Sequence, residues 1–322
     1  MKDLKPVLER IKEAKTIVIA SHVNPDGDSI GSLLSLGMGL ERLGKKVYMI
    51  CQDNVPGRYR LLPGAKRILK KIDKRCDLAI SVDCSNKEIL GRAYGVFEKA
   101  LSVLEIDHHD ARRPFGDLQL IDSSAAAVGE IIYTLLKKLG VAVDEEIAQN
   151  ILTSIIVETN SFRLPNVKPY TFRLCGALAE IVTDFQKLVD IVYWSKTREG
   201  IILSGICMSR CKFVNGGSVA WSIIRRKDYD KVKGKDDDVD EVADLIRSIE
   251  KVRIAVLFRE QDKKRLRVSL RSKGANVAAI AEMYNGGGHF DIAGCTIPND
   301  RKTIRKLLTQ LTDLDTSHSS GL

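Results

Sequence analysis

The feature that most constrains the fold is the alternation of short apolar runs with helical patterns in the first half of the chain. The apolar runs are TIVIA (residues 16–20), KKVYMIC, DLAISVD, SVLEIDHH and LQLID. The helical patterns include SIGSLLSLGMGLERLG, SAAAVGEIIYTLLKKLG and EEIAQNILTSIIVE. Uninterrupted apolar runs are typical of strands that are buried on both faces. Alternation of such strands with helices predicts an α/β domain, a mainly parallel sheet with helices on both faces.

The pattern changes near residue 215. The stretch LVDIVYWSKTREGIILSGICMSRC predicts a long helix or a helix pair, and VNGGSVA predicts a hairpin-like turn. A helix, DEVADLIRSIE, and two strands around QDKK follow, and the charge run KGKDDDVDEV is expected to be a solvated loop and helix N-terminus. The predicted organisation is a domain at 1–188, a helical linker at 189–215, a smaller α/β domain at 216–314 and a tail at 315–322.

Composition narrows the setting in which such a chain works. Hydrophobic residues make up 44% of the 322 residues, yet no apolar run has the length of a membrane span. The charged, amphipathic N-terminus lacks the apolar core of a signal peptide. Seven scattered cysteines without a CxxC pair favour reduced thiols over disulfides or a zinc site. We therefore expect a cytoplasmic protein that contacts no membrane. A net charge of +9 leaves a polyanionic partner open, and a homodimer is also left open.

Acidic and imidazole side chains follow the first predicted strand. The stretch SHVNPDGDSIGS contains His22, Asp26 and Asp28 directly after TIVIA. One interpretation is a solvated turn in which Asp28 or Ser29 caps the following helix. The other is a cation site, because an uncompensated carboxylate is very costly to bury.

The same kinds of side chain recur at the ends of other predicted elements. Asp83 ends one strand, Asp107, His108 and His109 end another, and Glu158 ends a helix. The carboxyl ends of parallel strands share one edge of a sheet, so these groups are expected to converge there. Converging carboxylates repel one another unless a cation lies among them. Imidazole and carboxylate without thiolate suit Mn²⁺, Fe²⁺ or Co²⁺, although Asp107 alone is also compatible with orienting a neighbour.

The motifs HVNPDGDSIGS, SVD and IDHH, in this order, resemble those of the DHH phosphoesterase superfamily. The stretch SLRSKGANVAAIAEMYNGGGHFDIAGC resembles the DHH-associated domain of that superfamily, whose mark is GGGH. Together these motifs span residues 15–297. The size and layout are most similar to superfamily members that hydrolyse short oligoribonucleotides and 3′-phosphoadenosine 5′-phosphate (pAp).

The resemblance implies two divalent metal ions, best served by Mn²⁺, and roles for the residues that match the motifs. It assigns the first ion to His22, Asp26 and Asp83, and the second to Asp28, Asp83, His108 and Glu158. It assigns catalysis to Asp83, Asp107 and His109, with His109 facing the scissile phosphate. Where the family has Asp, this chain has Glu158, and Asn160 stands where Gly is usual. The longer side chain is expected to weaken the second metal site.

The second domain carries a basic strand and a glycine turn. In RLRVSLRS, alternation places Arg265, Arg267, Ser269 and Arg271 on one face, which is either a phosphate-binding row or a solvated outer face. The glycines of GGGH permit close approach of backbone N–H groups to a ligand. With the resemblance, the substrate-binding set is Arg271, Ser272, Gly286, Gly287, Gly288 and His289.

These observations predict a metal-dependent phosphoesterase that acts on short single-stranded RNA or on nucleotides such as pAp. One alternative within the same class is hydrolysis of cyclic di-AMP or its linear product pApA. An alternative of another class is a nucleotide-binding regulator with weak catalysis, for which Glu158 is the motivating feature. A family II pyrophosphatase is disfavoured by GGGH, and a RecJ-type exonuclease by the absence of room for an added nucleic-acid-binding barrel.

Overall fold

The computed structural model describes residues 4–288 and 290–319 and divides the chain into two compact units, Met1–Ser195 and Lys196–Leu322. The division falls inside the stretch predicted as a helical linker. Of the two predicted alternatives, a long helix or a helix pair, the chain forms the pair: α7 (Phe185–Tyr193), which begins just before the predicted linker, and α8 (Arg198–Ser209). Among the described residues, no helix combines the length and apolarity needed to cross a bilayer.

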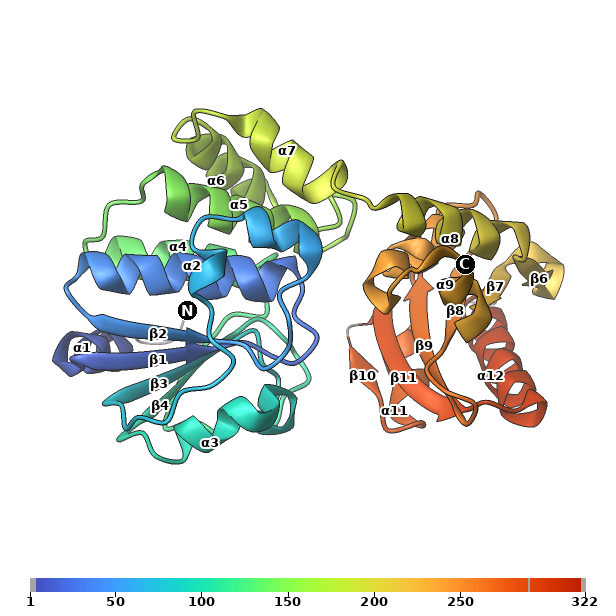
Figure 1. Cartoon of the computed structure of the whole chain (residues 1–322), viewed down its shortest axis with the longest axis horizontal. Helices are drawn as coiled ribbons and strands as arrows, with labels where there is room; N and C mark the ends of the chain where they lie inside the picture. The colour runs from blue at the N-terminus through green and yellow to red at the C-terminus, as the bar shows by residue number, and fades with distance from the viewer. Residues whose placement is uncertain (1–3, 289, 320–322) are drawn as a thin grey trace. The chain divides into compact units, whose positions relative to one another are not determined.

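The N-terminal unit is a parallel sheet covered by helices on both faces (Figure 1). Its strands are β1 (Thr16–Ala20), β2 (Lys46–Ile50), β3 (Leu78–Val82), β4 (Val103–Asp107) and β5 (Leu118–Ile121). Its remaining helices are α1 (Lys5–Glu13), α2 (Gly27–Arg42), η1 (Gly57–Leu61), η2 (Ala65–Arg67), η3 (Lys87–Ala93), α3 (Tyr94–Phe97), α4 (Val128–Lys138), α5 (Glu145–Glu158) and α6 (Pro169–Ala179). The five strands lie in the order β2-β1-β3-β4-β5, and neighbours pair in parallel. The predicted α/β class is confirmed.

Strand β1 shows why its sequence is apolar throughout. Ile17 and Ile19 belong to the core beneath α2, α4 and α5, whereas Val18 and Ala20 belong to a second core with residues of η3 and α3. All four side chains are fully buried. Because both faces of the strand are covered, a polar position would have no solvent to face.

Helices α2 and α5 approach each other closely at Gly31. A β-carbon at this position would lie 2.4 Å from the carbonyl oxygen of Asn150 and 3.1 Å from the Ser154 side chain. Only glycine therefore permits this separation of the two helices. The contact also brings the first turn of α2, with Asp28, against Ser154 of α5, whose hydroxyl donates to Asp28 at 2.6 Å.

The C-terminal unit is built on a mixed sheet of six strands in the order β10-β11-β9-β8-β7-β6. The strands are β6 (Lys212–Val214), β7 (Val219–Ile224), β8 (Ile254–Glu260), β9 (Arg265–Ser272), β10 (Gly287–Gly288) and β11 (Ile292–Pro298). The helices besides α8 are η4 (Asn215–Gly217), α9 (Arg226–Val232), η5 (Asp236–Val239), α10 (Val242–Arg247), α11 (Val277–Glu282) and α12 (Arg301–Ser319). The hairpin predicted at VNGGSVA is formed by β6 and β7 around η4. The segment predicted as a tail begins inside α12.

We predict that Gly31→Ala lowers the free energy of unfolding of the N-terminal unit by about 1–3 kcal/mol, because the new methyl group forces α2 away from α5. Gly176→Ala in α6 is the matched control, since a β-carbon there meets nothing within 4 Å. That change should stabilise by up to about 1 kcal/mol through helix propensity. Urea denaturation followed by circular dichroism measures both. Equal stability of Gly31→Ala and the parent would contradict the close packing.

Candidate metal centre

Strand order places one carboxylate between two imidazoles. Strand β3 lies between β1 and β4, and the residues that follow these three strands include His22, Asp83 and His108. Neighbouring strands are about 4.8 Å apart, so side chains at their ends come within reach of one another. Asp83 Oδ2 lies 3.5 Å from His22 Nε2, and Asp83 Oδ1 lies 3.9 Å from His108 Nε2. The two oxygens of Asp83 thus face different histidines.

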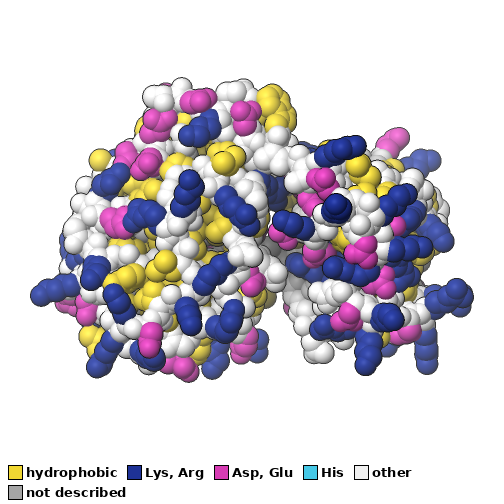
Figure 2. Space-filling model, in the orientation of Figure 1, with side chains coloured by type: hydrophobic (Ala, Val, Ile, Leu, Met, Phe, Trp, Pro, Cys, Tyr) yellow, Lys and Arg dark blue, Asp and Glu magenta, His cyan; other side chains and the backbone are white. Residues whose placement is uncertain are grey.

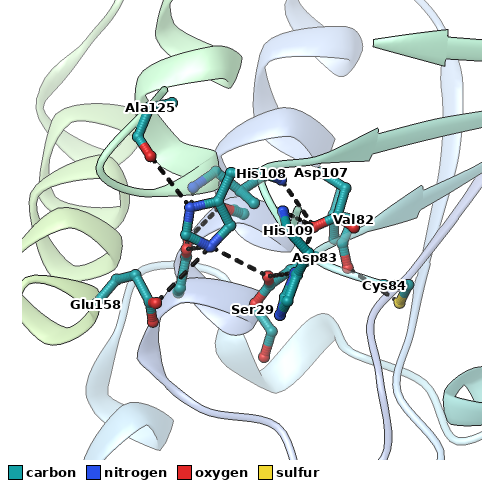
Figure 3. Close-up of polar contacts among 12 residues, drawn as sticks. Ser29, Val82, Asp83, Cys84, Asp107, His108, His109, Ala125 and Glu158 are labelled. Carbon is teal, nitrogen blue, oxygen red and sulfur yellow. Dashed lines mark hydrogen bonds and ion pairs between the residues drawn. The ribbon is translucent and has the colours of Figure 1, made fainter. Parts of the chain in front are cut away.

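Backbone carbonyls orient both of these imidazoles. His22 Nδ1 donates to the carbonyl of Val23 at 2.8 Å, and His108 Nδ1 donates to the carbonyl of Ala125 at 3.2 Å. A carbonyl only accepts, so each ring carries a proton on Nδ1. The Nε2 atom of each ring is directed toward the carboxylates, as Figure 3 shows for His108. Metal-binding histidines are commonly held through their second nitrogen in this way.

Asp26 combines two functions at the start of α2. Its side chain accepts from the Ser29 N–H at 2.9 Å, and the Ser29 hydroxyl accepts from the Asp26 N–H at 3.0 Å, which forms a capping box. The helix cap is therefore Asp26, and the expectation that Asp28 or Ser29 caps the helix is wrong. The same Asp26 Oδ1 lies 3.9 Å from His22 Nε2.

Asp28 is fully buried, which rules out the solvated turn considered above. It accepts hydrogen bonds from the hydroxyls of Ser32 (3.0 Å) and Ser154 (2.6 Å) and from the Val128 N–H (3.0 Å). Its Oδ2 lies 3.8 Å from His108 Nε2. Burial, reinforced by the nearby charge of Asp83, raises the pKa of Asp28 to about 7.

Glu158 reaches the same imidazole from the last residue of α5. Its Oε1 lies 3.7 Å from His108 Nε2. The glutamate carboxylate therefore reaches the group of residues to which the resemblance assigns the second cation, although the family has the shorter Asp at this position. The residues that follow, Asn160, Ser161 and Phe162, have φ angles of 45°, 61° and 62°. Three consecutive left-handed residues without glycine are unusual, and such strain is concentrated at functional sites. The same holds for Asp83, whose φ is 60°.

His109 is held through its Nδ1 atom by a carboxylate, that of Asp107. Its Nδ1 donates to Asp107 Oδ1 at 2.7 Å, and the other oxygen of Asp107 accepts from Arg112 Nε at 2.8 Å. Burial alone would lower the pKa of His109, but the Asp107 carboxylate outweighs it and raises this pKa to about 9. Asp107 therefore orients a neighbour, and it also accepts from the backbone N–H group of His108 at 2.8 Å. Both of these roles are compatible with its place at the end of the predicted strand, and its catalytic role remains a prediction.

Two buried charged residues that lie beside Asp107, Glu105 and Arg112, were not recognised in the sequence. Glu105 precedes Asp107 by two residues in β4, so the two side chains share a face of the strand. An acid inside an apolar strand run was the signal for Glu105. Arg112 had no comparable signal, because it lies in the loop that follows and its partners are set by the fold.

The site attracts positive charge strongly. Burial alone would lower the pKa of His22, yet its contact with Asp83 and the charges of Asp26 and Asp83 raise this pKa to about 10. Burial would raise the pKa of Asp83, but the three neighbouring histidines hold it below its usual value. Both shifts reflect the attraction between the Asp83 carboxylate and the imidazoles beside it, which favours the charged form of each group.

The donor set fits divalent cations. The His-to-carboxylate separations of 3.5–3.9 Å are longer than ordinary hydrogen bonds. Two atoms that share a cation at about 2.1 Å lie at most about 4.2 Å apart, and these pairs meet that limit. Two groups of candidate ligand atoms lie within 4.8 Å of one another: His22, Asp26 and Asp83, and Asp83, His108 and His109. Asp83 belongs to both groups.

The basic row of the C-terminal unit is largely neutralised. Arg271 Nε donates to Asp244 at 3.0 Å, and Arg267 lies 3.4 Å from Asp236. The buried Arg259 also contacts Asp236, which belongs to the charge run expected to be merely solvated. That expectation is wrong, because these half-buried guanidinium groups require carboxylates beside them. Figure 2 shows acidic and basic side chains interspersed over this unit.

The other predicted binding residues differ in their surroundings. Ser272 is buried and its hydroxyl donates to the Ala275 carbonyl at 2.5 Å, so it holds a turn and is a poor candidate for substrate contact. Gly286 and Gly288 pack against β11, where a β-carbon would lie 2.2 and 2.4 Å from backbone oxygens. Gly287 is exposed, and a β-carbon there would meet nothing within 4 Å. His289 lies outside the described residues.

Comparisons with protein families match both units. The sequence model of the DHH family N-terminal domain matches residues 16–157, and that of the DHHA1 domain matches residues 216–314. The bifunctional oligoribonuclease and PAP phosphatase NrnA of Thermus thermophilus is 32% identical over 282 residues, which cover 87% of this chain and 84% of the relative. The corresponding protein of Bacillus subtilis is 27% identical over 294 residues, with 88% and 89% covered.

Solved structures show the same fold. An exopolyphosphatase-related protein from Bacteroides fragilis superposes with a TM-score of 0.87 at 22% identity, covering 96% of this chain and 95% of that one. RecJ from Thermus thermophilus, in complex with Mn²⁺, has a TM-score of 0.56 at 14% identity, covering 97% of this chain and 54% of that one. At these identities the likeness concerns the fold alone.

We predict that Asp83→Asn weakens Mn²⁺ binding by at least about 100-fold. The amide removes the negative charge of the one carboxylate that belongs to both groups of candidate ligands. Asp77→Asn is the matched control. Asp77 precedes the same strand at the opposite edge of the sheet, where it accepts from the N–H groups of Lys15 and Thr16. Isothermal titration calorimetry with MnCl₂ measures both variants. Undiminished affinity in Asp83→Asn would exclude Asp83 as a shared ligand.

Proposed function

Because the chain belongs to the DHH family, it is a phosphoesterase, and we propose that it uses two divalent cations to hydrolyse short oligoribonucleotides and pAp. The observation that carries this proposal is Asp83, whose two oxygens face His22 on one side and His108 on the other. A carboxylate in this position is suited to bridging two cations.

The proposed ligands follow from the distances given above. His22, Asp26 and Asp83 would hold one cation, and Asp28, Asp83, His108 and Glu158 would hold the other. Two such cations lower the pKa of bound water and offset the negative charge of a phosphoryl group during in-line attack. Mn²⁺ is the proposed metal because imidazole and carboxylate ligands suit it and because it tolerates the geometry of Glu158.

The protein's own groups position the phosphate. With Nδ1 bonded to Asp107, His109 would meet a phosphoryl oxygen through Nε2. The left-handed backbone of Asp83 turns the chain directly after β3, so the carboxylate projects from the end of the strand. The carbonyls of Val23 and Ala125 keep both ligand rings turned toward this carboxylate. The imidazole rings and the Asp83 carboxylate are therefore already oriented before a substrate binds.

The substrate class rests on the relatives and on the C-terminal unit. Proteins named oligoribonuclease and PAP phosphatase match this chain over most of its length. In the C-terminal unit, Arg271 and the exposed Gly287 are the proposed substrate contacts. The pairing of Arg271 with Asp244 means that an incoming phosphate would compete with a carboxylate, which favours short substrates with terminal phosphates over non-specific binding of long strands.

A substrate panel with Mn²⁺ tests the proposal. It contains 5′-phosphorylated RNA of increasing length, matched DNA, pAp, pApA, cyclic di-AMP and pyrophosphate. We predict that RNA of two to about five nucleotides and pAp are hydrolysed at least about tenfold faster, by kcat/KM, than cyclic di-AMP or pyrophosphate. Preference for cyclic di-AMP or pApA would support that alternative. No hydrolysis of any member, with Mn²⁺ bound, would support a nucleotide-binding regulator.

Glu158 provides a second test. We predict that Glu158→Ala retains one Mn²⁺ and loses the second, with at least about a tenfold loss of kcat, because the second cation loses one of its carboxylates. Glu158→Asp should bind the second Mn²⁺ weakly if the backbone of α5 is adapted to Glu, and tightly if it lies where the family's does. Glu145→Ala, at the opposite end of α5, is the control and should keep both ions. Two tightly bound ions in Glu158→Ala would show that Glu158 is not a ligand.

A further inference from the structure

A buried guanidinium lies behind the candidate metal centre. The Arg112 side chain is only 7% exposed and lies between two carboxylates, Glu105 and Asp107, that are fully buried. Arg112 Nε donates to Asp107 Oδ2 at 2.8 Å, and Arg112 Nη2 donates to Glu105 Oε2. Two different nitrogens of the rigid guanidinium thus hold different acids, an arrangement that the single nitrogen of a lysine does not reproduce.

Each carboxylate has a second set of partners. Glu105 Oε1 accepts from the N–H groups of Phe115 (2.9 Å) and Gly116 (2.6 Å), which ties the loop after β4 back onto its own strand. Asp107 Oδ1 accepts from His109 Nδ1 at 2.7 Å and from the His108 N–H at 2.8 Å. A continuous chain of charged groups therefore runs from the loop to the ring of His109.

The burial of Arg112 decides what it can do. A side chain with two buried carboxylate partners cannot also extend to a phosphate in solvent, so Arg112 is not a substrate contact. Its effect on the reaction has to pass through Asp107. With Oδ2 engaged by Arg112, the Asp107 carboxylate cannot rotate, and Oδ1 stays aimed at the His109 ring.

We propose that Arg112 is a positioning residue, which holds the His109 ring in its working orientation by clamping Asp107 from behind. The role assigned to His109 rests on the proposed function, whereas the orientation of its ring does not. Glu105 lies on the side of the guanidinium away from His109, and its bonds to the N–H groups of Phe115 and Gly116 contribute to the stability of the loop. The neighbouring Arg113 has a different setting, since its side chain is 74% exposed and lies 3.4 Å from Glu88.

Arg112→Lys tests the clamp without removing the positive charge between two buried acids. The donors of an ammonium all lie on one freely rotating nitrogen and not on a rigid planar fork, so the Asp107 carboxylate gains freedom to rotate. We predict that kcat for the best substrate falls about 10- to 100-fold, while KM and the Kd for Mn²⁺ each change by less than about threefold. Arg113→Lys is the matched control and should leave all three values unchanged.

Glu105→Gln separates positioning from a merely structural role. The amide oxygen still accepts from the loop, and the bond from Arg112 to Asp107 remains, so stability should fall while kcat stays within about threefold of the parent. If kcat in Glu105→Gln and Arg112→Lys falls in proportion to the loss of stability, the role of Arg112 is structural and the proposal is wrong.

A spectroscopic readout is independent of activity. In protein labelled with ¹⁵N-histidine and prepared without metal, the Nδ1–H proton of His109 should be visible because its hydrogen bond slows exchange with water. We predict that this signal, assigned by its absence in His109→Gln, is retained in Arg113→Lys and Glu105→Gln and is shifted or lost in Arg112→Lys. An unchanged signal in Arg112→Lys would overturn the proposal even if no substrate had been found.

Discussion

The position of Asp83 between His22 and His108 is the constraint on which the candidate site depends. It follows from strand order, because β3 lies between β1 and β4 and each of the two histidines lies just beyond the end of a flanking strand. If the strands were ordered as they occur in the chain, β2 would separate β1 from β3, and His22 would lie about two strand spacings, roughly 10 Å, from Asp83. The topology of the sheet, more than any single residue, thus creates a carboxylate that two cations can share.

The surrounding structure serves to keep these groups in place at a cost in charge repulsion and backbone strain. Asp28 is buried against α5 because Gly31 lets the two helices meet, and hydroxyl and N–H donors stabilise its carboxylate. Asp83 adopts a left-handed conformation, which costs about 1–3 kcal/mol for a residue with a side chain. Bound cations would offset the repulsion, so metal binding and local stability are expected to be coupled.

The sequence predicted the fold and the convergence because both depend on local patterns. Continuous apolar runs identified the buried strands, and the shared edge of parallel strands predicted that His22, Asp83 and His108 lie close together. The DHH-like motifs then assigned roles that sequence patterns alone left open. Even the departure at Glu158 was visible, although its reach to His108 needed the structure.

What the sequence did not predict are partnerships between side chains distant in the chain or placed by loops. The capping residue was misassigned because three polar residues compete for one turn, and geometry selects Asp26. The arginines of β9 were expected to form a phosphate-binding row or a solvated outer face, and nothing in their alternation shows that Asp244 and Asp236 pair with Arg271 and Arg267. Arg112 was missed for the same reason. Ion pairs between side chains that are distant in the sequence depend on the tertiary structure, and the hydrophobic periodicity of the sequence does not predict them.

Anomalous diffraction from crystals grown with MnCl₂, recorded near the manganese absorption edge, would show whether Asp83 bridges two cations. If it does, two anomalous peaks are expected about 3.5–4 Å apart, one on each side of the Asp83 carboxylate. One peak is expected near His22 and Asp26, and the other near Asp28, His108 and Glu158. A single peak, or two peaks of which neither contacts Asp83, would exclude a bridging role for this carboxylate.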